Sequence, residues 1–242
     1  MAVDEIDITR EQGWYYEVQC QKVISKLIKN HIEAQFAPDR GEALRRLTAA
    51  IPEGATIGIG DSVTVHQIGF YSWLEQHPGR TIFNPFLKDP QGHNIYNPQE
   101  RFEVMRQAMT ADVFLASSNA ITQDGELVNI DATGNRVAAM IFGPRKVLLV
   151  IGANKIVDNL DEALKRVKEW CCPINLKRHI TKHHYSFFAK APCASGTCVD
   201  CDSPAKVCRK IVIIDGQLQM PEPHVSSESR IQVILVGESL GI

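Results

Sequence analysis

The sequence contains no hydrophobic run near the roughly 20 residues that a membrane-spanning helix needs. Its first residues, 1–7, contain neither the basic region nor the apolar stretch of a secretory signal peptide. It also has almost no net charge, with 26 Lys and Arg against 28 Asp and Glu, so no overall field would attract nucleic acid or an anionic membrane. These absences predict a cytoplasmic protein that binds neither nucleic acid nor membrane.

Several catalytic signatures are also missing. There is no Walker A loop, no complete GxGxxG fingerprint, no HExxH and no GxSxG elbow, and no convincing internal repeat or low-complexity segment. The composition, with 44% hydrophobic and 22% charged residues, is that of an ordinary globular protein. A chain of 242 residues suits one main domain with at most a small appendage.

The hydrophobic pattern predicts an α/β fold. Apolar residues at helical spacing indicate a long helix over about 10–34, and a capping box at Asp39 and Glu42 begins a second helix that ends before Pro52. Short, continuously apolar strands then alternate with helices, which predicts a three-layer fold with a largely parallel sheet and helices on both faces. The expected strands are 55–60, 81–85, 112–117, 126–131, 146–151, 211–214 and 231–236, and the later helices are 63–75, 98–109, 135–142 and 159–170.

This pattern predicts two parts. Residues 1–52 are expected to form N-terminal helices packed on the main domain, and residues 53–242 to form the α/β domain itself. Within the main domain the pattern decays over about 173–209, where basic, histidine and cysteine residues gather. We interpret this segment as a cysteine-bearing insertion whose ends return to the main sheet.

A glycine turn with hydroxyl side chains follows the first strand of the main domain. Glycine lets the backbone approach a ligand, N–H groups at a helix start point towards it, and hydroxyl groups donate hydrogen bonds. The turn predicts a site for a phosphate or carboxylate, while a tight turn with Asp61 or Ser62 as helix cap is the simpler alternative. The predicted ligand-binding residues are Gly58, Gly60, Ser62 and Thr64.

A second polar group follows two other strands. Ligands of open α/β sheets bind outside the carboxyl ends of the strands, so these loops are expected to face the glycine turn. A glycine, an amide and a cation at a helix start would orient a carboxylate or phosphate, although an ordinary turn and helix cap explain the same residues. The predicted ligand-binding residues are Ser118, Asn119, Thr133, Gly134, Asn135 and Arg136.

Four cysteines crowd into one short segment. Cys193, Cys198, Cys201 and Cys208 are separated by four, two and six residues. Disulfides are rare in a reducing cytosol, and four thiols in one loop can surround a tetrahedral zinc or an iron–sulfur cluster. The first two spacings match a ferredoxin arrangement and the third does not, so the spacing alone does not decide between zinc and iron. We place iron–sulfur slightly ahead of a structural zinc, with free or redox-active thiols as a further alternative.

Other cysteines and histidines are given structural interpretations. Cys20, Cys171 and Cys172 are expected to be small buried apolar residues. The pair His179 and His183, at helical spacing, is expected to form a solvated basic face because it has no carboxylate partner in a metalloprotease pattern.

Four stretches together resemble the LUD (lactate utilisation) domain family, in its short, single-domain branch that also carries the cysteine loop. The likeness covers about 18–241, and the stretch from Asn129 to Arg136 is its most distinctive part. The stretches that carry it are 58–64, 118–139, 142–147 and 154–157.

The resemblance implies a fold related to ribose-phosphate isomerases, glucosamine-phosphate deaminases and CoA transferases, in which a glycine turn holds a phosphate or cofactor. It also implies an association with lactate oxidation alongside iron–sulfur partner subunits. No CoA-transferase glutamate or isomerase acid/base pair can be matched onto this chain, and the sequence has no flavin or nicotinamide signature.

Three hypotheses follow. The first is a component of lactate or related organic-acid oxidation, in which the glycine turn binds a small anionic metabolite and the cysteines hold an electron-transfer cluster. The second is a phosphorylated-metabolite isomerase or CoA-transferase-like enzyme with a structural zinc. The third is a non-enzymatic sensing or assembly subunit, and a homo-oligomer is left open in each. The carboxylates to test for acid/base roles in the second hypothesis are Asp61, Asp124 and Asp131.

Overall fold

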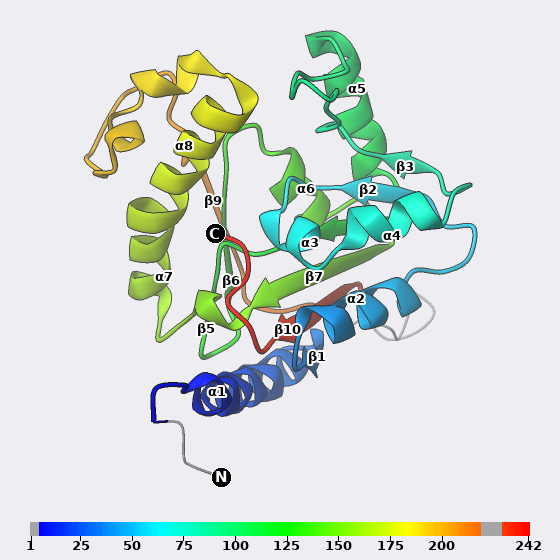
Figure 1. The fold of residues 1–242 in the computed structure, drawn as a ribbon, viewed down its shortest axis with the longest axis vertical. Helices are drawn as coiled ribbons and strands as arrows, with labels where there is room; N and C mark the ends of the chain where they lie inside the picture. Colours follow the sequence, from blue (N-terminus) through cyan, green and yellow to red (C-terminus); the bar gives the residue numbers. More distant parts are fainter. Residues whose placement is uncertain (1–4, 219–228) are drawn as a thin grey trace.

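The structure is a computed structural model that describes residues 5–218 and 229–242. Figure 1 shows a central sheet enclosed by helices, with helix α1 along one side and helices α5 and α8 projecting from the opposite side. None of the helices in the described part of the chain is both long and apolar enough to cross a membrane.

The core of the fold is a six-stranded sheet in which every pairing is parallel. Buried apolar runs form its central strands, as expected for a sheet covered on both faces. The strand order is β1 (Glu33–Ala37), β10 (Ile231–Val236), β7 (Lys146–Gly152), β4 (Val113–Ala116), β2 (Ile57–Ile59) and β3 (Ile82–Phe83).

Alternate strand residues enter two separate cores, one on each face of the sheet. Phe114 and Leu149 contribute to one core, whereas Leu115 and Val150 contribute to the other. The first face is covered by α1 (Thr9–Lys29), α5 (Pro98–Met109) and α6 (Asn135–Ile141), and the second by α2 (Arg40–Ala49), α3 (Val63–Gln67) and α4 (Phe70–Gln76). The predicted α/β fold with helices on both faces is therefore confirmed.

A smaller four-stranded sheet stands beside the main sheet. Its order is β8 (Ile156–Val157), β5 (Ala120–Thr122), β6 (Leu127–Asp131) and β9 (Lys210–Ile214), with antiparallel pairs on both sides of β6. Helices α7 (Leu160–Arg166) and α8 (Cys172–His183) are joined through a π-helical turn over Val167–Cys171, and they share a third core with this sheet and the cysteine segment. Short 3₁₀ turns cover Ala153–Lys155, Ser186–Lys190 and Pro192–Ser195.

Local signals located several helix starts correctly. Asp39 accepts a hydrogen bond from the Glu42 N–H at 2.8 Å, and Asn97 forms a complete capping box with Glu100 at the start of α5. The helix expected over 63–75 is divided into α3 and α4 at Gly69, which has a φ of 85°. This left-handed conformation favours glycine and ends the first helix.

Three expectations about connections were wrong. Residues 33–37 form edge strand β1 rather than the end of a helix, so the N-terminal block 1–52 contributes a strand as well as helices. The helix expected to end at 170 continues into α8, because a π-helical turn over Val167–Cys171 precedes Pro173 and alters the hydrogen-bond pattern that a proline would otherwise interrupt. Strand β9 pairs with β6 in the small sheet, so only β10 returns to the main sheet after the cysteine segment.

Candidate functional site

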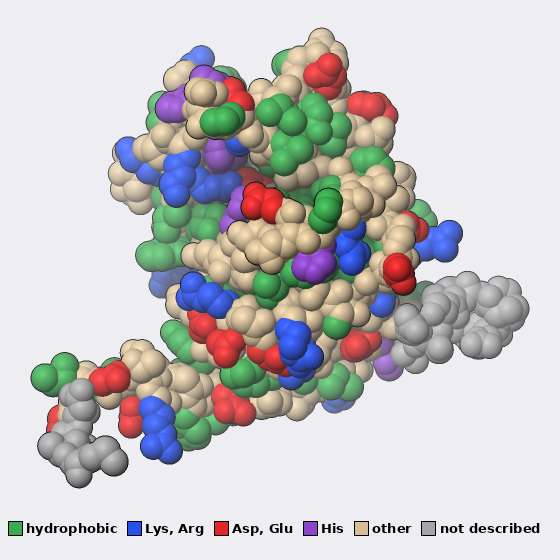
Figure 2. Space-filling model, turned by 45° about the vertical axis from the view of Figure 1, so that its right-hand side comes forward, with side chains coloured by type: hydrophobic (Ala, Val, Ile, Leu, Met, Phe, Trp, Pro, Cys, Tyr) green, Lys and Arg blue, Asp and Glu red, His purple; other side chains and the backbone are tan. Residues whose placement is uncertain are grey.

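A pocket of about 470 Å³ lies at the carboxyl edge of the main sheet. Ser62, Ser117 and Lys155 line it, and they follow the neighbouring strands β2, β4 and β7. Side chains of α5 and α8 close the opposite side, and Figure 2 shows a hollow between two projections of the surface. Its volume falls within the range of about 300–1,000 Å³ typical of small-molecule sites. The position agrees with the expectation that the loops after these strands meet.

The predicted glycine turn contributes to the pocket in part. Asp61 and Ser62 line it, but the Ser62 hydroxyl accepts a hydrogen bond from the Val65 N–H at 3.2 Å and so caps α3. A Cβ on Gly58 would lie 2.2 Å from the Ala108 carbonyl oxygen, so this glycine allows α5 to approach β2. Gly60 lies against Arg136 and Phe114, and neither glycine lines the pocket.

Lys155 links the loops on the floor of the pocket. Its ammonium donates to the Ser117 hydroxyl at 3.1 Å, and to the Thr64 hydroxyl and the Ser118 carbonyl at 3.2 Å each. Lys155 is only 3% exposed, and burial lowers its pKa to about 7. Thr64 is fully buried and reaches the site only through Lys155 and Ser117.

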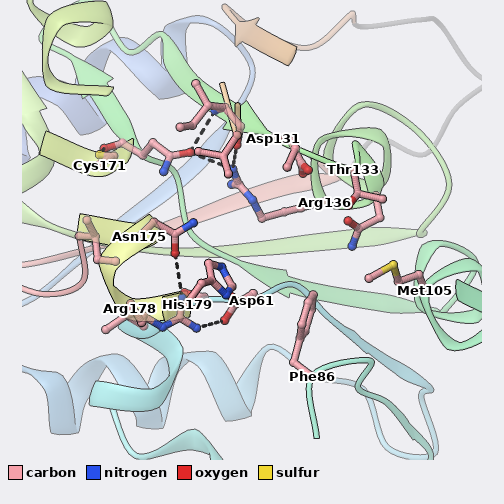
Figure 3. A pocket seen from close by; sticks show the side chains of 18 of the residues that line it. Asp61, Phe86, Met105, Asp131, Thr133, Arg136, Cys171, Asn175, Arg178 and His179 are labelled. Carbon is pink, nitrogen blue, oxygen red and sulfur yellow. Dashed lines mark hydrogen bonds and ion pairs between the residues drawn. The ribbon is translucent and has the colours of Figure 1, made fainter. Parts of the chain in front are cut away.

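Arg136 is an internal scaffold cation. Its guanidinium donates to the side-chain oxygens of Asn119 and Asn129 at 2.8 and 2.7 Å, and to the carbonyls of Ser117 and Ile130 at 2.8 and 2.6 Å. Arg136 therefore fixes the loop after β4 against the end of β6, and it presents a positive charge beneath the pocket with most of its donors already used. Figure 3 shows its place at the wall of the pocket.

The loop before α6 supplies further predicted residues. Thr133 and Asn135 line the pocket, as do Ser118 and Asn119 from the loop after β4. The Asp131 carboxylate accepts from the Gly134 N–H at 2.7 Å and the Val137 N–H at 3.3 Å, so it mainly orders the start of α6. Gly134, with a φ of 102°, does not line the pocket and forms the turn into this helix.

Helix α8 contributes charged residues that sequence reasoning missed. Arg178 donates to Asn175 at 3.0 Å and pairs with Asp61 across the pocket, as drawn in Figure 3. Burial raises the pKa of the Asp61 carboxyl, but the Arg178 guanidinium outweighs that effect and holds the pKa below its ordinary value. Asp61 is therefore an ionised partner of Arg178 and not a free general base.

Two nitrogen atoms beside the pocket have no protein partner within the described residues. They are Arg101 Nε on α5, which is a donor, and His179 Nδ1 on α8, which donates or accepts according to the tautomer of the ring; both side chains line the pocket. Burial lowers the pKa of His179 to about 4, so its ring is neutral near pH 7. A buried N–H without an acceptor costs free energy, and a ligand oxygen would satisfy it. The solvated basic face expected at His179 is thus a half-buried wall of the pocket.

Asp124 is separate from this site. It is exposed, forms an ion pair with Lys26 at 2.7 Å and does not line the pocket. Of the three carboxylates considered for acid/base roles, only Asp61 and Asp131 lie at the pocket, and both are already paired.

The missed residues have weak signals in the sequence. Lys155 and Arg178 are single basic residues without a motif, and their importance depends on which strand and helix carry them. Lys155 was the more predictable, because it follows directly after a strand that continues the buried sheet. Arg178 could not be found once the helix was expected to end before Pro173.

The cysteine segment packs against α8 in the third core, and its residues Phe188 and Val207 also line the pocket. All seven cysteines of the chain are free thiols, and Cys193 is buried in the third core. Burial and the neighbouring thiols of Cys198, Cys208 and Cys201 raise the pKa of Cys193, so the four predicted metal ligands lie near one another.

These thiols suit a soft metal by their chemistry, because thiolate sulfur is the ligand that zinc and iron–sulfur clusters take from proteins. Across residues 5–218 and 229–242, no three Cys, His, Asp or Glu side chains are already arranged to hold a single metal ion. A tetrahedral zinc requires its sulfurs about 3.8 Å apart, given a Zn–S distance of about 2.3 Å. A cluster of several sulfide-bridged irons accepts thiols that are more widely spaced.

Comparison with known proteins gives a family. The LUD domain model matches residues 20–226. A crystal structure described as a DUF162 family protein from Deinococcus radiodurans is similar to the chain, with 12% identity and a TM-score of 0.49, over 91% of this chain and 98% of that one. No curated protein matches the chain. Because the family match spans most of the sequence, the chain belongs to the LUD domain family.

Proposed function

We propose that the protein binds a small organic anion, of the size and chemistry of a hydroxy or oxo acid, as a component of organic-acid utilisation. The LUD family relates to lactate utilisation, which favours lactate and its relatives as the first ligands to test. The observation that carries the proposal is the convergence of cationic groups and of two side-chain nitrogens without protein partners on one pocket.

The electrostatics of the pocket favour an anion. Three guanidinium groups and the Lys155 ammonium border it, whereas Asp61 and Asp131 are its two acidic side chains. Asp61 is neutralised by Arg178, and Asp131 accepts from two backbone N–H groups. The remaining positive potential and the Arg101 Nε donor suit a carboxylate, and His179 Nδ1 adds a second donor in the tautomer that carries its proton there.

The test is ligand binding by calorimetry or thermal shift with lactate, pyruvate and longer hydroxy acids. Arg101→Met is expected to weaken binding about tenfold or more, because it removes a charge-assisted hydrogen bond at the pocket. Arg106→Met is the matched control, since Arg106 lies on the same helix but is exposed and paired with Glu103 at 3.1 Å. Equal affinities in the two variants, or no binding of any organic acid by the wild type, would contradict the proposal.

The second part of the proposal is a metal centre at the cysteine segment. The four cysteine thiols suit an iron–sulfur cluster, with a single zinc ion as the alternative. Such a cluster would supply one-electron transfer, and partner subunits would then deliver or accept the electrons. Anaerobic purification with iron, zinc and sulfide analysis and a visible spectrum tests it; colourless protein with stoichiometric zinc would remove the redox part.

The pocket volume favours testing a larger ligand as well. A three-carbon acid occupies only a fraction of about 470 Å³, so a phosphorylated metabolite or the end of a CoA ester also fits the space. Tighter binding of phosphorylated sugars or CoA esters than of hydroxy acids, with structural zinc at the cysteines, would support this second candidate.

A further inference from the structure

Two adjacent cysteines in the joint between α7 and α8 face different parts of the molecule. The π-helical turn over Val167–Cys171 ends where α8 begins at Cys172. A π-helical turn contains an extra residue, which rotates the side chains that follow it to a different side of the helix. Such turns are frequent at functional sites. Cys171 lines the pocket and donates to the Asn119 carbonyl at 3.7 Å, and Figure 3 shows it at the pocket edge. Cys172 belongs instead to the third core.

Cys172 contacts the cysteine segment. Its side chain is 1% exposed, and it shares that core with Cys193 and the partly buried Cys208. The Cys172 thiol lies beside those of Cys208 and Cys193. The short turn over Pro192–Ser195, which carries Cys193, packs against α8.

The remaining thiols continue from this buried group towards the surface. Cys198 lies near Cys208 and Cys201, and both Cys198 and Cys201 are half-buried. A cluster with four thiolate ligands therefore has five thiols available to it. Cys172, Cys193 and Cys208 are anchored by packing in the third core, whereas Cys198 and Cys201 are not part of that core.

We propose that Cys172 is a ligand of the metal centre, together with Cys193 and Cys208, and that Cys198 or Cys201 provides the fourth thiolate. The inference rests on the proposed metal centre and extends its ligand set from the loop to the helix that walls the pocket. An anchored helix thiol gives the loop, which consists mainly of short turns, a rigid point of attachment. It also places the centre one residue from Cys171 and thus beside the pocket.

The alternative is that Cys172 only fills space in the core, as a buried cysteine commonly does. That role requires an apolar residue of similar size, so alanine would replace it with little loss. A ligand role requires the sulfur itself. Alanine and serine substitutions at this position therefore separate the two roles, and Cys171 provides a control one residue away.

The experiment compares wild type, Cys172→Ala, Cys172→Ser and Cys171→Ala, all purified anaerobically and reconstituted with iron and sulfide. Iron and sulfide content, the visible spectrum and the electron paramagnetic resonance signal are measured, with circular dichroism and thermal unfolding to verify folding. Both Cys172 variants are expected to lose metal affinity by about tenfold or more, while Cys171→Ala retains its metal.

If the variants fail to fold, crystals of the reconstituted wild type provide the test through anomalous scattering at the metal edge. Metal within bonding distance of the Cys172 sulfur supports the proposal. Full metal content in a folded Cys172→Ala variant, or metal bonded only to loop cysteines, overturns this inference and leaves the proposed metal centre intact. A wild type that takes up no metal overturns both.

Discussion

The pocket floor and the cysteine segment are built in different ways. The floor consists of residues from the loops that follow strands β2, β4 and β7. The parallel pairing of these strands fixes the position at which the backbone leaves each strand. Lys155 and Arg136 then join these loops through seven hydrogen bonds to oxygen. Residues 186–209 instead contain only short 3₁₀ turns and bends, and few buried apolar side chains.

The difference indicates where each region obtains its rigidity. The floor is held by the sheet and by buried hydrogen bonds, and it does not depend on a ligand for its shape. The cysteine segment has too little core of its own, so a metal that crosslinks its thiols would provide a large part of its stability. The two regions should therefore respond differently to the same perturbations.

Removal of metal should produce the largest contrast. After chelation, amide hydrogen exchange over 186–209 is expected to accelerate by about a hundredfold or more, because bound metal contributes directly to local folding free energy. Exchange in strands β4, β7 and β10 should remain unchanged. Comparable acceleration in the strands, or none in the cysteine segment, would contradict the distinction between the regions.

Gly58→Ala should destabilise the main domain by about 3 kcal/mol or more, since the new Cβ would lie 2.2 Å from the Ala108 carbonyl oxygen. Urea unfolding measures the change. Gly13→Ala is the control, because Gly13 lies within α1 with no atom near its added Cβ, and it should stabilise by about 0.5–1 kcal/mol. An unchanged stability for Gly58→Ala with lost ligand affinity would return the glycine turn to a direct binding role.

Arg178→Met should lower the free energy of unfolding by about 2 kcal/mol, because it leaves the mostly buried Asp61 carboxylate without its partner. The side chains of Arg178 and Asp61 are 16% and 20% exposed, so the effect is smaller than for a fully buried pair. Chemical denaturation at pH 7 measures it. The double variant with Asp61→Asn should recover part of the loss. A double variant no more stable than Arg178→Met would show that the pair does not stabilise the site.

Ligand affinity should depend on pH through Lys155, whose pKa is about 7. The amine is charged below this value, so affinity for an organic anion is expected to be highest near pH 6 and to fall a few-fold, about threefold to tenfold, by pH 8.5. His179, with a pKa of about 4, is neutral throughout, and burial keeps the Cys171 thiol protonated. Titration calorimetry at several pH values measures the trend, and Lys155→Met should abolish it; affinity that rises with pH would oppose this assignment.

Asp124→Ala should produce the smallest effect. Its ion pair with Lys26 is exposed on both sides, and such pairs contribute about 0–1 kcal/mol. Stability should change by less than about 0.5 kcal/mol, and ligand binding should not change. Loss of binding in this variant would require a second site at the far end of β5.

Several elements of this comparison were predictable from local sequence. The buried strands 113–116 and 146–152 and the capping box at Asn97 have continuous apolar runs or specific side-chain patterns, and these depend only on neighbouring residues. The position of Ser118 and Asn119 at the pocket followed from the rule that ligands bind at the carboxyl ends of parallel strands, whereas Thr133 and Asn135 follow β6, whose partners β5 and β9 are antiparallel.

Other elements could not be predicted from local sequence. Edge strand β1 has only one fully buried residue, so its sequence lacks the apolar run of a central strand. Arg178 and Cys172 lie beyond a point where a proline usually ends a helix, and the π-helical turn that carries α7 into α8 has no clear sequence signal.

By itself the sequence determined the α/β class, the family and the presence of a thiol-rich segment, because these depend on hydrophobic period, motif and residue type. The tertiary structure alone decided which polar residues share the pocket, that Arg136 and Asp131 are occupied by the scaffold, and that Cys172 faces the thiols. Those facts depend on the order of the strands and on which side of each helix packs against the rest of the molecule. Both arise from contacts between residues far apart in the chain.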